Sequence, residues 1–199
     1  MIKLNKKSES FISDETLIEQ YNSGDIDSFH VLYQRFATDM YTYALRHRLD
    51  AAVANDILQI VWEKIILKQD DFVLKIKRSH PPFVFKFYLY KMVKNAILDH
   101  FRHHSKEITM EDNEDSYHAV IEAELTTLDE DMIAEEKYKK LIGAIEALPY
   151  TQRETFLLIK EAGLSLKEVA DIQEISIETA KTRRRYAYDK LKPYLEAMQ

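Results

Sequence analysis

The sequence SLKEVADIQEISIETAKTRRRYAYDKLK, residues 165–192, decides the fold of the C-terminal part of the chain. It opens with Ser165 and Glu168 at the spacing of a capping box, in which each residue satisfies a free backbone N–H of the first helical turn. Ser176 has the character of a second N-cap. The two helical stretches carry small residues on facing sides, Ala170 and Ala180. A capped helix, a tight turn and a second capped helix predict a helix-turn-helix.

The second helix of this motif carries most of its positive charge. In helix-turn-helix proteins the N-terminal turns of that helix enter the major groove, where Arg contacts guanine edges and Lys or Thr contacts phosphates. The residues predicted on its outer faces are Glu178, Thr179, Lys181, Thr182, Arg183 and Arg185. Cations that only complement the helix dipole would lie at the helix end, whereas these lie in its middle. A helical hairpin that binds protein remains open as another use of the same unit.

The composition of the whole chain favours helices throughout. Its 199 residues include only three glycines and four prolines, whereas helix-forming residues are plentiful. There is no cysteine, which excludes disulfides and thiolate metal sites and suits a reducing compartment. No stretch has the roughly 18 apolar residues that a membrane helix needs, and the N-terminus lacks the apolar run of a signal peptide. We therefore expect an all-α, cytoplasmic protein with no cofactor and no membrane insertion.

The formal net charge of −6 is distributed unevenly. Residues 107–136 contain twelve Asp or Glu and no Lys or Arg, whereas the segments 1–106 and 137–199 each carry a charge of +3. Because salt screens charges beyond about 8 Å, such local patches matter more than the total. This pattern predicts two small helical domains, 1–106 and 137–199, joined by an acidic linker that DNA repels. Within the first domain, residues 69–82 are polar and end in two prolines, which predicts an excursion of unknown role.

A helix is predicted over about 83–104, and its sides differ in character. At 100° per residue, Leu89, Met92, Val93, Ala96 and His100 form a core face. The neighbouring stripe contains Tyr88, Lys91, Asn95, Asp99 and Arg102. Aromatic rings stack on unpaired bases and cations follow phosphates, so this stripe suits single-stranded nucleic acid. The alternative is an ordinary ion pair between Asp99 and Arg102 beside aromatic residues that fill the core.

Four segments, taken in chain order, carry a family resemblance. They are LIEQYNSGDIDSFHVLYQRF from residue 17, ANDILQIVWEKI from residue 54, FKFYLYKMVKNAILDHFR from residue 85 and LIGAIEALPYTQRETFLLIKEAGLSLKEVADIQEISIETAKTRRR from residue 141. Together they resemble the extracytoplasmic-function (ECF) group of the bacterial sigma-70 family of RNA polymerase sigma factors. The resemblance covers nearly the whole chain outside the acidic segment and residues 69–82.

The resemblance implies a function for each segment. The second segment would dock on core RNA polymerase through Asp56, Gln59 and Glu63. The third would help to melt the −10 promoter element and hold its single strand, with Asn95, Asp99 and Arg102 matching the family pattern. The fourth would read the duplex −35 element. Members of this family are transcription initiation factors without catalytic activity, and an anti-sigma factor is a common partner.

Several residues depart from the family pattern. Asn55 and Ile60 stand where acidic residues are usual, and Tyr88 stands where Trp is frequent. Arg184 replaces an aliphatic residue on the inner face of the last helix, so we expect its stem to be buried and its guanidinium to reach the surface. Tyr186 replaces a frequent Arg, which removes one expected phosphate contact.

Three other functions fit parts of the sequence. A self-sufficient helix-turn-helix regulator would bind an operator as a dimer through its N-terminal block. An enzyme would hold a metal ion at DHFRHH, with Asp99, His100, His103 and His104 as ligands. A protein-interaction scaffold is the third alternative, but it leaves the arginine-rich helix unexplained. The presence of all four segments in order favours the sigma factor.

Overall fold

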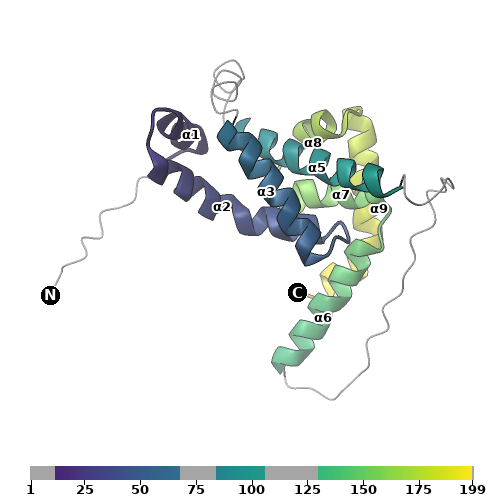
Figure 1. Cartoon of the computed structure of the whole chain (residues 1–199). Helices are drawn as coiled ribbons and strands as arrows, with labels where there is room; N and C mark the ends of the chain where they lie inside the picture. Colours follow the sequence, from purple (N-terminus) through teal and green to yellow (C-terminus); the bar gives the residue numbers. More distant parts are fainter. Residues whose placement is uncertain (1–11, 68–83, 106–129, 199) are drawn as a thin grey trace.

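The computed structural model describes residues 12–67, 84–105 and 130–198, and its regular elements in these ranges are all helices (Figure 1). They are α1 (Asp14–Asn22), α2 (Ile26–Leu45), α3 (Ala51–Leu67), α5 (Val84–Ser105), α6 (Glu130–Glu146), α7 (Tyr150–Lys160), α8 (Leu166–Gln173) and α9 (Ile177–Glu196). The prediction of an all-α fold is confirmed. Within the described ranges, none of the helices has the length and apolar character to cross a membrane.

Side-chain caps set where the first two helices begin. Ser13 caps α1, because its hydroxyl accepts a backbone N–H of the first turn at 3.2 Å. The acidic Asp14 that follows is the first helical residue. Asp25 caps α2 by accepting the backbone N–H two residues further on, also at 3.2 Å. Between the two helices Gly24 has a φ of 103°, a left-handed value that glycine adopts without strain.

The helices α1, α2, α3 and α5 form an N-terminal lobe around apolar side chains at helical spacing. Its buried residues include Leu32, Phe36, Met40, Ile57, Val61, Leu89 and Val93. Fully burying one such side chain contributes roughly 1.5–3 kcal/mol. At one end of the lobe the buried Trp62 contacts two rings of α2, with ring centroids 5.6 Å from Phe29 and 5.1 Å from Tyr33. These contacts hold α3 against α2.

The helices α6, α7, α8 and α9 form a C-terminal lobe that contains the predicted helix-turn-helix. The capping box of Ser165 and Glu168 is complete, and Ser176 caps α9. In the turn between α8 and α9, Glu174 adopts a left-handed φ of 57°, a conformation that costs a residue with a side chain some strain. Both Ala170 and Ala180 are buried, as expected for two helices in close contact. The α6 helix projects from the rest of the molecule beside the end of α9 (Figure 1).

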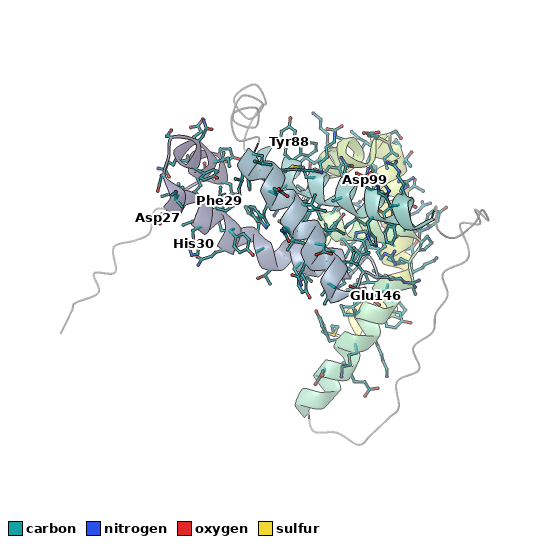
Figure 2. All side chains as sticks on the ribbon, viewed as in Figure 1. Asp27, Phe29, His30, Tyr88, Asp99 and Glu146 are labelled. Atoms are coloured by element: carbon teal, nitrogen blue, oxygen red, sulfur yellow. The ribbon has the colours of Figure 1, made fainter. Side chains whose placement is uncertain are left out.

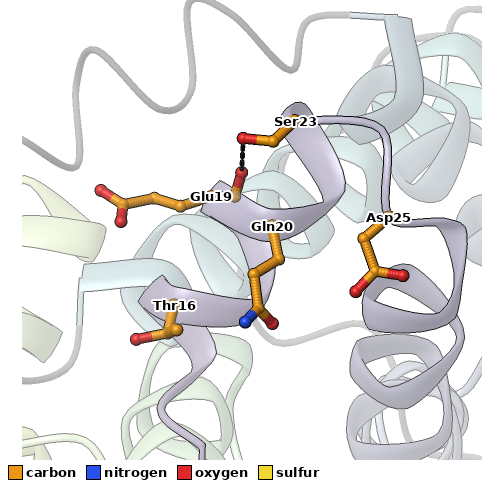
Figure 3. Close-up of a pocket in the computed structure, with 5 residues that line it drawn as sticks. All are labelled: Thr16, Glu19, Gln20, Ser23 and Asp25. Atoms are coloured by element: carbon orange, nitrogen blue, oxygen red, sulfur yellow. Dashed lines mark hydrogen bonds between the residues drawn. The ribbon is translucent and has the colours of Figure 1, made fainter.

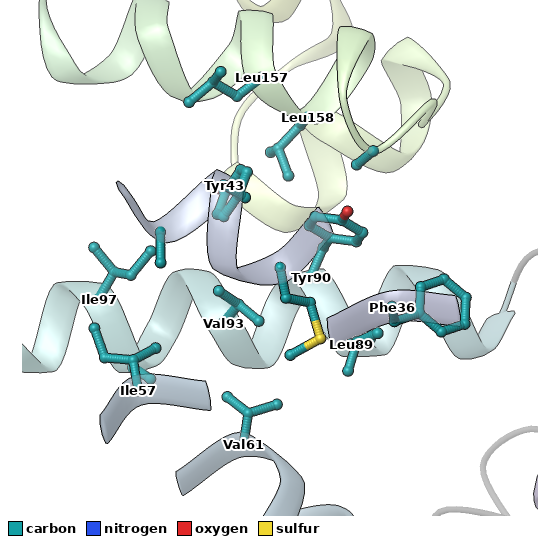
Figure 4. Packing of buried hydrophobic residues seen from close by; sticks show 14 of the residues in the cluster. Phe36, Tyr43, Ile57, Val61, Leu89, Tyr90, Val93, Ile97, Leu157 and Leu158 are labelled. Carbon is teal, nitrogen blue, oxygen red and sulfur yellow. The ribbon is translucent and has the colours of Figure 1, made fainter. Parts of the chain in front are cut away.

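The two lobes pack against each other and share one continuous set of buried side chains. Tyr43 of α2 and Tyr90 of α5 lie between the N-terminal helices and Leu157 and Leu158 of α7 (Figure 4). All four of these side chains are buried. Two domains and a linker are predicted from the sequence, whereas the contact between the domains is a finding of the structure. This contact brings the two predicted nucleic-acid surfaces into one compact body.

Part of the predicted organisation falls outside the described residues. This holds for the excursion at 69–82 and for the acidic segment as far as residue 129. The α6 helix begins at Glu130, inside the acidic segment 107–136. Two ion pairs follow on α6, Glu135–Lys139 and Glu136–Lys140, and each joins two residues one helical turn apart. The last two acids of the segment are therefore paired with lysines of the C-terminal lobe.

Candidate nucleic-acid and polymerase interface

The N-terminal turns of α9 are held by their own side chains. The Ser176 hydroxyl accepts the backbone N–H of Thr179 at 3.0 Å, and the two hydroxyl oxygens lie 2.9 Å apart. Lys181 and Glu178 form an ion pair of 2.7 Å in which both side chains are at least half exposed. Such an exposed pair contributes little to stability, so its lysine can exchange partners at small cost. The start of α9 thus has a defined backbone and adaptable side chains.

The outer face of α9 forms a hollow of about 620 Å³. Its lining residues are Glu178, Lys181, Thr182, Arg184, Arg185, Tyr188 and Asp189. The Arg185 guanidinium lies 5.2 Å from the centre of the exposed Tyr186 ring, a cation–π contact that restrains it. Of the residues predicted on the outer faces, Glu178, Thr179, Lys181, Thr182 and Arg185 are exposed. Exposed cations beside hydroxyl groups and an aromatic ring suit contact with phosphates and base edges.

The consecutive arginines Arg183 and Arg184 differ from the prediction, which placed Arg183 on the outer face of α9 and Arg184 on the inner face. Arg184 is exposed and lines the outer hollow, so the prediction that its stem is buried is wrong. Arg183 is the half-buried one, and its guanidinium donates to the Gln173 side chain of α8 at 3.1 Å. The reason is the position of α8, which covers the Arg183 side of α9 and leaves the Arg184 side to solvent.

The predicted stripe on α5 lies along an accessible side of that helix. We call Tyr88, Lys91, Asn95, Asp99 and Arg102 the α5 stripe. Tyr88 and Lys91 are half-buried and the other three are exposed. Figure 2 labels Tyr88 and Asp99 at two positions along the helix. Asp99 and Arg102 form the ion pair considered as the alternative, at 3.4 Å, with both side chains more than half exposed. This pair leaves both groups in contact with water.

Aromatic contacts orient the N-terminal end of the α5 stripe. The rings of Phe87 and Tyr88 meet edge to face, with their centroids 5.4 Å apart. The Lys91 ammonium lies 5.9 Å from the centre of the Phe87 ring. Phe87 thus packs against both side chains of the stripe and restrains them. A ring and a cation held side by side suit a stacked base and its phosphate.

The predicted polymerase-docking residues share one exposed face of α3. Asp56, Gln59 and Glu63 are three and four residues apart, so they lie on one side of the helix, and all are exposed. Ile60, which replaces a usual acidic residue, is 43% exposed beside them. The opposite side of α3 is buried in the lobe, so its orientation is fixed. The face offers two carboxylates, an amide and an exposed aliphatic side chain to a partner.

A buried carboxylate lies where the lobes meet, and the sequence analysis did not single it out. Glu154 of α7 accepts hydrogen bonds from the Tyr150 hydroxyl at 3.3 Å and the Gln173 amide at 3.0 Å. Burial raises the pKa of Glu154 to about 7, although Lys94 and Arg183 partly oppose this. The only sequence signal that marked this residue is an acid two positions before the apolar residues Phe156, Leu157 and Leu158. Hydrogen bonds thus connect Arg183 of α9, through Gln173, to the junction between the lobes.

A buried histidine lies against Tyr150, the donor to this carboxylate. His47, which follows α2, is fully buried, and its ring contacts Tyr43 and Tyr150 at centroid distances of 4.8 and 5.3 Å. Burial lowers the pKa of His47 to about 3, and the nearby Arg153 guanidinium adds to the effect. His47 is therefore neutral at physiological pH. Among the described residues, neither ring nitrogen of His47 has a hydrogen-bond partner.

The residues considered for a metal site do not form one in the part of the chain that the structure describes. No three His, Asp or Glu side chains there are close enough to hold an ion, and this includes Asp99, His100 and His103. The side chain of His104 lies outside the described residues. The metal-dependent enzyme therefore has no geometric support from these side chains.

A second hollow, of about 350 Å³, lies where α1 turns into α2 (Figure 3). It is lined by Thr16, Glu19, Gln20, Ser23 and Asp25. The Ser23 hydroxyl donates to the Glu19 carbonyl at 2.9 Å, and Asp25 caps α2. These polar groups serve the turn itself, and the two acids would repel nucleic acid.

Comparison with known proteins decides the family. Residues 32–107 match the family described as Sigma-70 region 2, and residues 138–191 match Sigma-70, region 4. The RNA polymerase sigma factor SigZ of Bacillus subtilis is 30% identical over 166 residues, which cover 83% of this chain and 85% of SigZ. The chain belongs to the ECF group of sigma-70 factors. The ECF RNA polymerase sigma factor SigM of the same organism is 26% identical over 73% of this chain and 81% of SigM.

The fold agrees with this membership. The chain resembles the structure described as the sigma factor RpoE in complex with the anti-sigma factor NepR from Bartonella quintana, with a TM-score of 0.60. The match covers 86% of this chain and 98% of RpoE at 22% identity, so it supports the fold alone. As an ECF sigma factor, the protein binds core RNA polymerase and directs it to specific promoters. The region 2 match contains α3 and α5, and the region 4 match contains α8 and most of α9.

Proposed function

We propose that this sigma factor divides promoter recognition between α9 and α5 and binds polymerase through α3. The division follows from the exposed chemistry of each helix. The outer face of α9 presents cations and hydroxyl groups, the α5 stripe presents a ring, an amide and cations, and the face of α3 presents carboxylates. Each surface suits a different partner: duplex DNA, unpaired DNA and a polymerase element.

For the −35 element, we assign the major-groove contacts to Glu178, Thr179, Lys181, Thr182, Arg183 and Arg185. A helix diameter of about 10–12 Å with its side chains fits the major groove, which is about 12 Å wide. Arg183 would read a base edge, because its contact with Gln173 restrains the guanidinium before DNA binds. Lys181 and Arg185 would contact phosphates, where exact position matters less.

For the −10 element, we assign the unpaired strand to the α5 stripe. Tyr88 would stack on a base that has left the duplex, and Asn95 would hydrogen-bond to a base edge. Lys91 and Arg102 would neutralise the phosphates on either side. Unstacking a base costs a few kcal/mol, and stacking on an aromatic ring returns roughly 1–3 kcal/mol per base. The stripe therefore stabilises DNA that polymerase has begun to open.

For polymerase, we assign the docking contacts to Asp56, Gln59 and Glu63 of α3. Carboxylates at the rim of such an interface accelerate association with a basic partner and select its orientation. The protein itself would carry out no catalysis, because these surfaces position DNA and polymerase and contain no nucleophile–base pair. We further propose that it acts in the cytoplasm, where polymerase and promoter DNA are found.

We propose the domain boundaries 1–106 and 137–199 around the acidic linker 107–136, and an anti-sigma factor as a further partner. The two family matches end and begin close to these boundaries, at residues 107 and 138. The anti-sigma proposal is supported by the similar structure, in which RpoE is bound to the anti-sigma factor NepR. Co-purification of the protein from its host, followed by mass spectrometry, tests this partner.

The observation that carries the proposal is that one chain presents the α5 stripe and the α9 face as separate exposed surfaces. The test substitutes one residue in each surface and measures transcription in vitro with core polymerase. Asn95→Ala is expected to slow promoter opening, seen as delayed reactivity of unpaired thymines, while binding to the closed duplex is unchanged. Arg183→Ala is expected to weaken duplex binding instead. Equal effects of both substitutions on both steps would contradict the division.

A gel-shift experiment separates this function from a self-sufficient dimeric regulator. We expect the purified protein alone to bind promoter DNA weakly, because a few phosphate contacts are readily lost to salt. Core polymerase is expected to produce a specific complex, since it holds both surfaces near the DNA and raises their effective concentration. Tight, specific binding without polymerase would favour the regulator.

A further inference from the structure

Gln173, the last residue of α8, connects three helices of the C-terminal lobe. Its amide oxygen accepts from the Arg183 guanidinium of α9 at 3.1 Å, and its amide nitrogen donates to the Glu154 carboxylate of α7 at 3.0 Å. The Thr155 hydroxyl of α7 lies 3.0 Å from the same amide oxygen. All three hydrogen bonds lie within the C-terminal lobe, so they do not require the N-terminal lobe.

The Glu154 carboxylate determines which way the Gln173 amide points. An ionised carboxylate only accepts hydrogen bonds, so it binds the nitrogen of the amide and leaves the oxygen for α9. Glu154 is itself held in place, because it is only 3% exposed and also accepts from the Tyr150 hydroxyl at 3.3 Å. With its nitrogen bound to Glu154, the amide cannot turn over without losing a hydrogen bond to a charged group.

Arg183 is the donor on which the Gln173 oxygen depends. The Thr155 hydroxyl has a single proton, and the backbone carbonyl of Thr151 lies 2.8 Å from it on the same helix. Thr155 therefore cannot donate to both acceptors at once, whereas the guanidinium is always charged. The bond to Gln173 uses one of its five N–H donors, so Arg183 can still contact a guanine edge through two others.

This restraint acts at the border of the surface assigned to DNA. Arg183 is half-buried against α8, whereas Thr179 and Tyr186, one turn before and one turn after it on the same side of α9, are exposed. An unrestrained arginine can contact a phosphate beside any base, which gives affinity without sequence preference. An arginine already held in one place loses less entropy when it binds there. The bond to Gln173 therefore favours one base contact over alternative phosphate contacts.

We propose that Gln173 and Glu154 are positioning residues for −35 recognition: Glu154 fixes the orientation of the Gln173 amide, and the amide oxygen directs Arg183 to one base of the element. This inference rests on the proposed assignment of Arg183 to a −35 base edge. It makes the sequence preference of the protein depend on α7 and α8 as well as on α9.

The test measures how strongly the holoenzyme, formed with core polymerase, prefers a matched −35 element over one with a single substituted base pair. Burial raises the pKa of Glu154 to about 7, so binding is titrated at about pH 8, where most of this carboxyl is ionised. Gln173→Leu removes both hydrogen bonds and is expected to lower the preference about fivefold, the effect of immobilising one long side chain only on binding. Binding to the substituted element should be unchanged.

Two further comparisons show whether Gln173 acts through Arg183. In a protein that already carries Arg183→Ala, Gln173→Leu is expected to have no additional effect on the preference, because the group that it positions is gone. Gln152→Leu makes the same change at another half-buried glutamine, on α7, and is the control. We expect Gln152→Leu to leave the preference unchanged.

An exchange of the two groups separates positioning from packing. Glu154→Gln allows the Gln173 amide to turn over, because the new side chain can donate as well as accept. We expect this variant to lose part of the preference. Adding Gln173→Glu restores one carboxylate and one amide to the pair, with the carboxylate beside Arg183, and we expect the preference to recover.

Urea denaturation checks that each variant folds. An unchanged preference after Gln173→Leu, together with a lower one after Arg183→Ala, would overturn the positioning role and leave the assignment of Arg183 intact. An unchanged preference after Arg183→Ala would instead remove the assignment on which this inference rests. Equal weakening of both DNA elements after Gln173→Leu, without recovery in the exchanged protein, would overturn the inference by showing that Gln173 only supports the fold.

Discussion

Arg183 and Arg184 are neighbours in sequence but differ in their surroundings, and this difference predicts different effects on DNA. Arg183 is restrained by Gln173, whereas Arg184 is exposed at the outer hollow. We expect Arg183→Ala to reduce the preference of the holoenzyme for the correct −35 sequence about tenfold or more, since a bidentate base contact gives about 1–3 kcal/mol. Arg184→Ala is expected to weaken binding to all sequences alike and to lower the salt slope by about one.

Titration of promoter binding across salt concentrations, on a matched and a mutated −35 element, distinguishes these two effects. Arg184→Ala serves as the control for the loss of one positive charge. Equal losses on both DNA sequences after Arg183→Ala would show that Arg183 contacts only the backbone of the DNA.

The buried His47 and Glu154 have opposite effects on stability as pH changes. The pKa of His47 is lowered to about 3, so the unfolded state binds more protons and the free energy of unfolding falls as pH drops below about 6.5. The pKa of Glu154 is raised to about 7, so the folded state binds more protons and the free energy of unfolding rises as pH drops from 7 to about 4.5. Between pH 7 and 5 each effect amounts to about 2 kcal/mol, and the two nearly cancel.

Substitution of either group should reveal the effect of the other. Relative to the wild type, we expect Glu154→Gln to lose about 2 kcal/mol of stability between pH 7 and 5, because the protonation of Glu154 no longer offsets that of His47. Relative to the wild type, His47→Phe is expected to gain a similar amount over the same range, because the protonation of His47 no longer offsets that of Glu154. Urea denaturation at both pH values measures each change. The same slope in all three proteins would mean that neither pKa is shifted in the folded state.

At the scale of the element, α3 has one face in the core and one exposed acidic face. We expect Asp56→Lys to weaken binding to core polymerase at least tenfold, because it places a cation where a carboxylate would meet a basic partner. Folding should be unaffected, since Asp56 is exposed. Asp171→Lys makes the same change of charge at an exposed position on α8 and is the control. Fluorescence titration with core polymerase measures both, and equal weakening would point to net charge alone.

The α5 helix shows how far an amphipathic pattern can be interpreted. The predicted core face is correct for Leu89, Val93 and Ala96, which are buried. Tyr90 and Ile97 are also buried but were not predicted, because the C-terminal lobe covers their side of the helix. Helical periodicity identifies which residues share a side, but it does not identify what covers that side. For the same reason, the sequence pattern did not show that Lys94 contacts the C-terminal lobe, where its ammonium donates to the Ile172 carbonyl.

At the scale of the whole molecule, the sequence predicts the parts of the fold better than their assembly. The helix-turn-helix was predictable because its caps are local: Ser165, Glu168 and Ser176 act within a few residues of themselves. The junction between the lobes was not, because it depends on Arg46, Lys94 and residues more than 70 positions away. The equal positive charges of segments 1–106 and 137–199 favour separate domains. Salt screens this repulsion, and burial of the aromatic side chains at the junction outweighs it.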